Sequence, residues 1–118
     1  VPAALAFKAA YMLGGVMAES AWIHAMTAGA FATMILAVMT RASLGHTGRM
    51  LVVSRTTVAS YVLLTVAAML RVVAPELPGQ LHWNALQLAG VAGIAAFTLY
   101  LIAYAPILLA PRADGRPG

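Results

Sequence analysis

Three ionisable side chains lie in or beside long apolar runs, where such groups are unusual. His24 lies four residues inside one run, Arg71 lies near the end of a second, and His82 opens a third. An ionisable group in a membrane span is costly and is by default a functional-site hypothesis. A neutral imidazole can bind haem iron or copper through one ring nitrogen, and a guanidinium can hold a propionate carboxylate by two hydrogen bonds. The three residues are therefore predicted to bind a cofactor.

Each of these residues also has a simpler structural interpretation. In this interpretation His24 forms a hydrogen bond with a neighbouring helix, and His82 is a histidine of the membrane interface beside Trp83. Arg71 can extend its side chain toward the lipid headgroups. The residue types alone do not choose between ligation and these roles.

The segment from Arg41 to Arg49 is the densest polar part of the chain. The two arginines flank His46, and Gly45 and Gly48 permit tight backbone turns. Such a loop can bind an anion, a lipid phosphate or a cofactor carboxylate, or it can simply anchor the chain on the positive side of a membrane. His46 is a rival metal ligand to His24, but about 33 Å of helix separates them, so they cannot share one metal.

The composition excludes most other classes of protein. Of 118 residues, 63% are hydrophobic and 8% are charged, whereas a soluble domain carries about 25% charged residues. No cysteine is present, which removes disulfides, thiolate metal sites and cysteine nucleophiles. The scattered cations, despite a net charge of +4, form no stripe for nucleic acid. The three acids form no catalytic pair, so an enzyme of the soluble type is disfavoured and enzymatic activity remains an open question.

The apolar runs predict an all-α transmembrane bundle of four helices. Their expected bounds are 3–18, 20–42, 55–73 or 74, and 83–109. A span needs about 20 apolar residues, so the second and fourth helices qualify easily, the third is tight, and the first is short. We expect a transmembrane segment over 1–110 and a loose, polar tail over 111–118.

The distribution of charge predicts the orientation in the membrane. Arg41, Arg49 and Arg55 lie on one side of the helices together with the tail, and this side is expected to be cytoplasmic. Glu19 and Glu76 then face outward.

Several segments of the chain resemble the NnrS family. The resemblance covers nearly the whole sequence and rests on the runs His24–Ala30, Thr33–Met34, Leu36–Arg49, Leu70–Pro75, Tyr104–Leu109, Pro111–Arg112 and Asp114–Pro117. The motif positions are His24, Thr27, Gly29, Arg41, Gly45, His46, Gly48, Arg49, Arg71 and Arg112. Ala32 and Ile35 depart from the pattern, which has Gly and Thr there; neither change touches a histidine.

The resemblance implies a multi-pass protein of the bacterial inner membrane with a cytoplasmic tail. It further implies haem and, more weakly, copper, and a role in nitric oxide response or resistance linked to denitrification, with nitric oxide or iron–nitrosyl species as partners. A full member has about twelve helices, so this chain is expected to be a C-terminal portion that packs against upstream helices in the lipid bilayer. His24 is then the expected haem ligand, with Arg71 near a propionate.

Two other functions fit the residues. The histidines of a metal or small-molecule transporter would line a path with polar groups at several depths, yet the middle of the second helix offers mainly Thr27 and Thr33. A structural membrane subunit without a cofactor would use His24 and Arg71 only to bridge helices.

Overall fold

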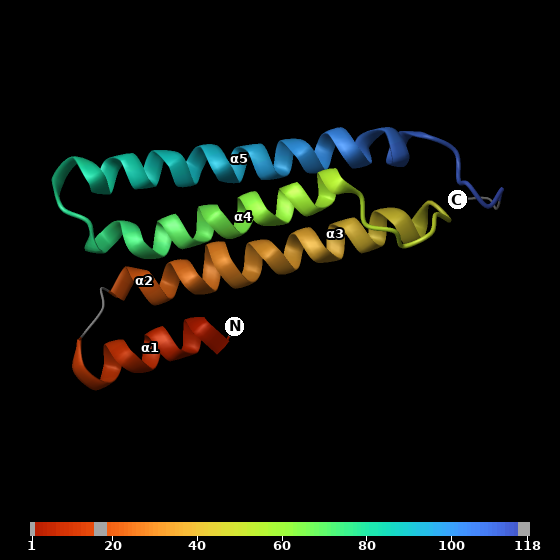
Figure 1. Cartoon of the computed structure of the whole chain (residues 1–118). Helices are drawn as coiled ribbons and strands as arrows, with labels where there is room; N and C mark the ends of the chain where they lie inside the picture. The colour runs from red at the N-terminus through yellow and green to blue at the C-terminus, as the bar shows by residue number, and fades with distance from the viewer. Residues whose placement is uncertain (1, 16–18, 116–118) are drawn as a thin grey trace.

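The computed structural model describes residues 2–15 and 19–115, which form helices and connecting segments without a β-strand. The elements in order are α1 (Pro2–Gly14), α2 (Glu19–His24), the π-helix η1 (Ala25–Phe31), α3 (Ala32–His46), α4 (Arg55–Val73), the 3₁₀ turn η2 (Ala74–Glu76) and α5 (Gly79–Leu109). The elements α2, η1 and α3 follow one another without a break and form a single long rod (Figure 1). The predicted all-α fold is confirmed.

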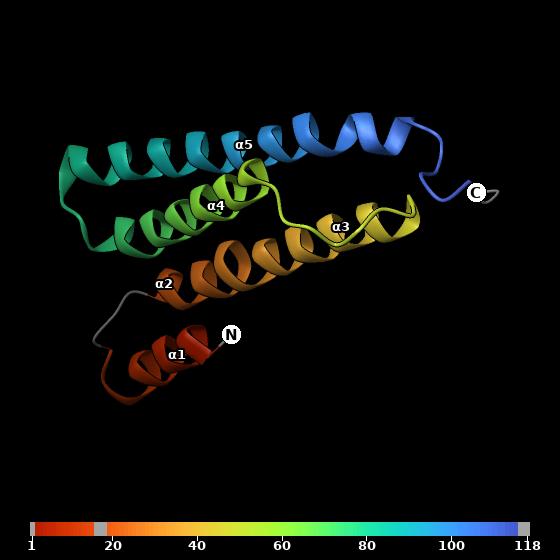
Figure 2. The same cartoon turned by 45° about the vertical axis from the view of Figure 1, so that its right-hand side comes forward.

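The long helices lie side by side in an antiparallel bundle. Figures 1 and 2 show α4 between α5 and the α2–α3 rod, with the shorter α1 on the outside of that rod. Within the described residues, three stretches of helix are long and apolar enough to cross a membrane: Glu19–His46, Arg55–Glu76 and Gly79–Leu109. Together with the apolar composition, these spans make the chain a multi-pass membrane protein in a lipid bilayer.

Small residues fill many of the contacts between the helices, and a few large residues such as Leu36 form a buried core, whereas many other large apolar residues face outward. Ala21, Ala67, Ala89 and Ala96 are buried. Leu13, Ile94 and Leu109 are examples of large side chains with more than two thirds of their surface exposed, at 88%, 71% and 88%. Small residues let helix backbones approach closely in lipid, where the outward face needs no polar cover.

The second and fourth predicted helices are longer than the apolar runs indicate. The second continues past Ala42 to His46, and the fourth begins at Gly79 rather than at Trp83. Both extensions contain polar residues at the ends of the membrane spans. A search for apolar runs therefore does not predict them. The turn that follows α3 contains Gly48, whose φ of +67° is unfavourable for other residues.

The first helix ends at Gly14, before the predicted end at residue 18. Residues 16–18 and 116–118 lie outside the described ranges, and with them the small residue Ala18 and the tail cation Arg116. The helix α1 contacts the rod, because the Nζ atom of Lys8 lies 4.9 Å from the centre of the Trp22 ring. This cation–π contact gives the charge of Lys8 a partner on the rod.

Candidate functional site

The structure brings His24, Arg71 and His82 to one end of the bundle. His24 is the last residue of α2, Arg71 lies in the last turn of α4, and His82 lies in the first turn of α5. Figure 1 shows these helix ends together on the left. We call this the His24 end. The three side chains are not joined by hydrogen bonds to one another among the described residues.

The two histidines at this end have different hydrogen bonding. The Nδ1 atom of His24 is buried and has no hydrogen-bond partner among the described residues. The Nδ1–H group of His82 donates to the backbone oxygen of Ala74 at 2.8 Å, which leaves the lone pair of the neutral ring on Nε2. A donated Nδ1–H is the arrangement that orients metal-binding histidines. Both rings therefore suit a ligand role, His24 by its unmet polar atom and His82 by its fixed orientation.

The helix changes its winding directly after His24. Residues Ala25–Phe31 form the π-helix η1, and π-helical turns inside α-helices are rare and often lie at functional sites. Within this turn, the Thr27 hydroxyl donates a hydrogen bond to the backbone oxygen of Ile23 at 2.8 Å. The predicted motif His24–Ala30 thus coincides with an irregular turn in a membrane-spanning helix.

Two cavities flank the π-helix. The first, of about 590 Å³, lies between the rod, α4 and α5, and is lined by Ala28, Ala32, Leu64, Ala67, Arg71, Ala89, Gly90, Gly93, Ile94, Phe97, Thr98 and Leu101. We call it the Arg71 cavity. A Cβ atom added at Gly90 or Gly93 would meet no atom within 4 Å. Ala28, four residues after His24 along the rod, lines its wall, whereas His24 itself is not one of the lining residues.

The second cavity lies on the other side of the π-helix and is almost wholly apolar. It has a volume of about 710 Å³ between α1, the rod and α4, and Ala25, Gly29, Thr33 and Ala37 line it along the rod. We call it the Ala37 cavity. Because none of the described residues that line it is ionisable, this part of the wall offers no charged group to anchor a cofactor carboxylate.

The remaining predicted metal ligand lies far from these residues. His46 is exposed at the C-terminal end of α3, at the opposite end of the same continuous rod from His24. We call this opposite end the Arg41 end. The described residues contain no group of three or more His, Cys, Asp or Glu side chains placed to hold a metal ion.

The segment predicted as a loop at the Arg41 end is largely helical. Arg41, Gly45 and His46 belong to α3, and only Gly48 and Arg49 lie in the turn that follows. A Cβ atom added at Gly45 would meet no atom within 4 Å. The prediction of a tight turn at Gly45 is therefore wrong, whereas Gly48 has the positive φ that such a turn needs.

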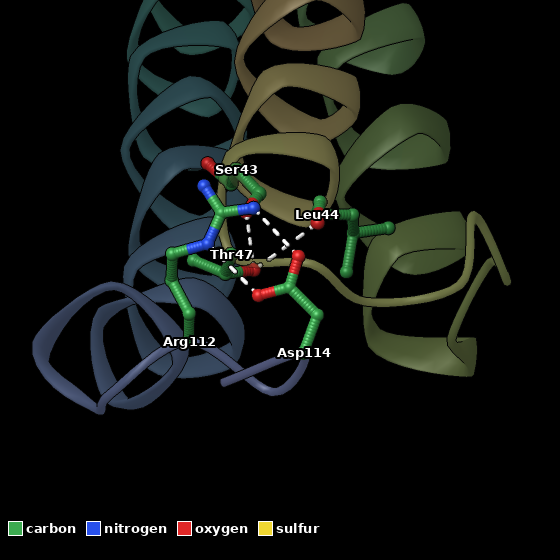
Figure 3. A network of polar contacts seen from close by, with 5 residues as sticks. All are labelled: Ser43, Leu44, Thr47, Arg112 and Asp114. Carbon is green, nitrogen blue, oxygen red and sulfur yellow. Dashed lines mark hydrogen bonds and ion pairs between the residues drawn. The ribbon is translucent and has the colours of Figure 1, made fainter. Parts of the chain in front are cut away.

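The first residues of the C-terminal tail are docked on this turn. The backbone N–H of Ala113 donates to the oxygen of Thr47 at 2.9 Å, and Arg112 pairs with Asp114 through two hydrogen bonds of 2.9 and 2.7 Å (Figure 3). The hydrogen bonds that Arg112 donates to Asp114 raise the pKa of the Arg112 guanidinium. The expectation of a loose tail is therefore wrong for residues 111–115.

Sequence reasoning missed a group of buried tyrosine contacts near the Arg41 end. The hydroxyl of Tyr100 lies 2.9 Å from Ser43 Oγ, and that of Tyr104 lies 3.0 Å from Thr57 Oγ1. The two tyrosine rings stack with centres 4.8 Å apart. The only sequence signal is the spacing of four residues between two tyrosines in an apolar run, which places both on one helix face.

Comparison with known proteins agrees with the resemblance seen in the sequence. A family model described as NnrS protein matches residues 1–112. The search found no significant match among curated proteins and none among solved structures. The family match covers most of the chain, including the His24 end, the Arg41 end and Arg112.

Proposed function

The chain belongs to the NnrS family, and we propose that it is a haem-binding protein of the bacterial inner membrane that acts in the response to nitric oxide, with its tail in the cytoplasm. The observation that carries the proposal is the buried, unpartnered Nδ1 atom of His24 at the edge of a π-helix. A buried polar atom without a partner costs about 1–3 kcal/mol. A chain keeps such an atom where a bound group or a partner segment satisfies the ring.

The Arg71 cavity fits the dimensions and chemistry of a haem better than its neighbour does. Its volume of about 590 Å³ lies in the range of cofactor pockets. Alanine and glycine residues make up much of its wall, which favours a flat, apolar ring, and Arg71 supplies a cation for a propionate. The Ala37 cavity has the apolar wall without the cation.

His24 and His82 are the side chains that would hold the haem. Their helices, α2 and α5, reach the same end of the bundle as Arg71. When bound, haem supplies an iron that changes oxidation state and binds nitric oxide. The chain's own contribution is to present neutral imidazoles, to neutralise a carboxylate, and to keep water away by its apolar helices.

Copper does not fit the described residues. No group of three His, Cys, Asp or Glu side chains is formed among them, and His46 lies at the other end of the rod. We therefore assign no step to copper in this part of the protein, although the family resemblance implied it.

The experiment fills each cavity in turn and measures the haem retained. The protein is purified from membranes with haem supplied during growth, and haem is quantified per protein by the pyridine haemochrome absorbance. Gly93→Leu places a side chain in the Arg71 cavity, at a position with open space around its Cβ. Ala37→Leu places the same side chain in the Ala37 cavity and is the matched control.

We expect Gly93→Leu to lose most of its haem while Ala37→Leu retains it, with both variants eluting as folded protein in size-exclusion chromatography. Equal retention in all three proteins would show that haem does not occupy the Arg71 cavity. If the folded wild-type protein contains no haem even when haem is supplied, the haem proposal fails. The transporter and structural-subunit functions would then remain.

A further inference from the structure

A third, smaller cavity lies at the Arg41 end, away from the histidines. It has a volume of about 210 Å³ and is lined by Thr40, Arg41, Leu44, Leu51, Val53, Thr57, Tyr61 and Tyr104. We call it the Arg41 cavity. Four of these residues carry hydroxyl groups, and one carries a permanent positive charge. The proposed haem function uses none of them.

The hydroxyl groups of the cavity are held in fixed pairs. The Thr40 and Tyr61 hydroxyls lie 3.2 Å apart, and those of Thr57 and Tyr104 lie 3.0 Å apart. A hydroxyl that donates to its partner keeps lone pairs free, and one that accepts keeps its proton free for a further acceptor. In the first pair, Thr40 donates its proton to the backbone oxygen of Ala37 at 3.0 Å, so Tyr61 donates to Thr40 and the pair has no proton left. Tyr104 keeps its proton when it accepts from Thr57, and it can then donate to an anion without rearranging the bundle.

The charged residues around the cavity are mostly basic, and Asp114 of the docked tail is the acidic residue described at this end. Arg41, Arg49 and Arg55 lie within this end of the bundle, and the one ion pair formed among the described residues joins Arg112 to Asp114. The Nε atom of Arg49 is buried without a hydrogen-bond acceptor. The other two acids of the sequence, Glu19 and Glu76, lie toward the His24 end.

An apolar segment of extended chain borders the same cavity. Met50, Leu51, Val52 and Val53 connect the turn after α3 to α4, and their exposed fractions are 82%, 57%, 65% and 65%. Leu51 and Val53 also line the cavity. Figure 2 shows this connection running back along α3 before α4 begins. Apolar side chains beside arginines suit a ligand with a charged head and a hydrocarbon tail.

We propose that the Arg41 cavity binds an anionic phospholipid of the leaflet in contact with this end of the protein. Arg41 and the Tyr104 hydroxyl donate to the phosphate, and an acyl chain lies along Leu51 and Val53. A free phosphate would use the charged part of the site and leave the four exposed apolar residues uncovered. The lipid satisfies both parts, because basic sites near a membrane surface bind anionic headgroups.

The test compares three probes on the purified protein in a neutral detergent. These are dioleoyl phosphatidylglycerol, dioleoyl phosphatidylcholine and inorganic phosphate. Native mass spectrometry counts the retained lipid, and the melting temperature measures stabilisation. Arg41→Gln removes the cavity cation, and Val53→Asp removes part of the apolar wall. Arg112→Gln is the matched control, because it removes one positive charge at the same end without lining the cavity.

We expect phosphatidylglycerol alone to be retained and to raise the melting temperature, with affinity about fivefold weaker in Arg41→Gln. Val53→Asp should weaken it as well, whereas Arg112→Gln should match the wild type. Stabilisation by inorganic phosphate equal to that by the lipid would overturn the lipid assignment. An equal loss of lipid affinity in Arg41→Gln and Arg112→Gln would show that the lipid is held by general charge attraction. That result would also overturn the proposed site.

Discussion

The hydroxyl oxygens of Ser43 and Tyr100 lie 2.9 Å apart in the buried interior, although 57 residues separate them in the sequence. Ser43 lies on α3 and Tyr100 on α5, so the contact joins the first long span to the last. One helical turn further along α5, Tyr104 makes the equivalent contact with Thr57 of α4. These two hydrogen bonds fix how the three spans meet near the Arg41 end.

Tyr100→Phe should destabilise the bundle by about 1 kcal/mol, because hydrogen bonds between helices in membranes are worth roughly 0.6–1.7 kcal/mol. The ring and its stacking on Tyr104 remain, so the loss reports the hydroxyl alone. Unfolding by sodium dodecyl sulfate, followed by circular dichroism, measures it. Tyr11→Phe, which removes an exposed hydroxyl of α1, is the control and should leave stability unchanged. Equal stability of Tyr100→Phe and Tyr11→Phe would contradict the predicted contribution.

Two glycines of the same motif should respond oppositely to alanine. Gly48 has a φ of +67°, so the backbone conformation alone should make Gly48→Ala about 1–2 kcal/mol less stable. A Cβ at this position would also lie 2.5 Å from Asp114 Cγ, so the substitution should undock the tail. Gly45 is helical with open space around it, so Gly45→Ala should be neutral or stabilising. Melting temperatures in detergent compare the two. A Gly48→Ala variant as stable as Gly45→Ala would show that the turn and the docked tail are absent in solution.

The absence of cysteine from the sequence makes the orientation directly testable. Gln80→Cys places a thiol at the start of α5, and Ala113→Cys places one after its end. We expect a membrane-impermeant maleimide to label Gln80→Cys in cells with a permeabilised outer membrane, and to label Ala113→Cys only after the inner membrane is opened. The reverse pattern would invert the orientation. Labelling of both from one side would contradict α5 as a span.

Much of the fold follows from local sequence, because each span is an apolar run that must form its backbone hydrogen bonds internally. The ends of the helices do not follow in the same way. The polar residues from Ser43 to His46 continue α3 by one turn, and a hydropathy pattern does not distinguish such a turn from a loop. The docking of Ala113 on Thr47 depends on where α5 ends, which is a property of the assembled bundle.

The candidate site was partly predictable for a related reason. A histidine inside an apolar run stands out by itself, and so His24 and Arg71 could be singled out from the sequence. Their relation to a cavity could not, because Gly90 and Gly93 of α5 form its far wall and lie more than sixty positions further along the chain than His24. The buried hydroxyl of Tyr104 could not be predicted from the sequence either, because its importance depends on its hydrogen bond with Thr57 of another helix.

The central claim is that haem is bound at the His24 end, and the reduced-minus-oxidised optical spectrum tests it most directly. The spectrum is recorded for the intact, haem-supplemented protein and for His24→Ala and His46→Ala, with folding checked by size-exclusion chromatography. His46 is exposed at the opposite end of the same rod, so its variant controls for loss of any histidine. We predict a Soret band in the wild type and in His46→Ala that is lost in a folded His24→Ala. A Soret band that persists in His24→Ala and disappears in His46→Ala would contradict the account.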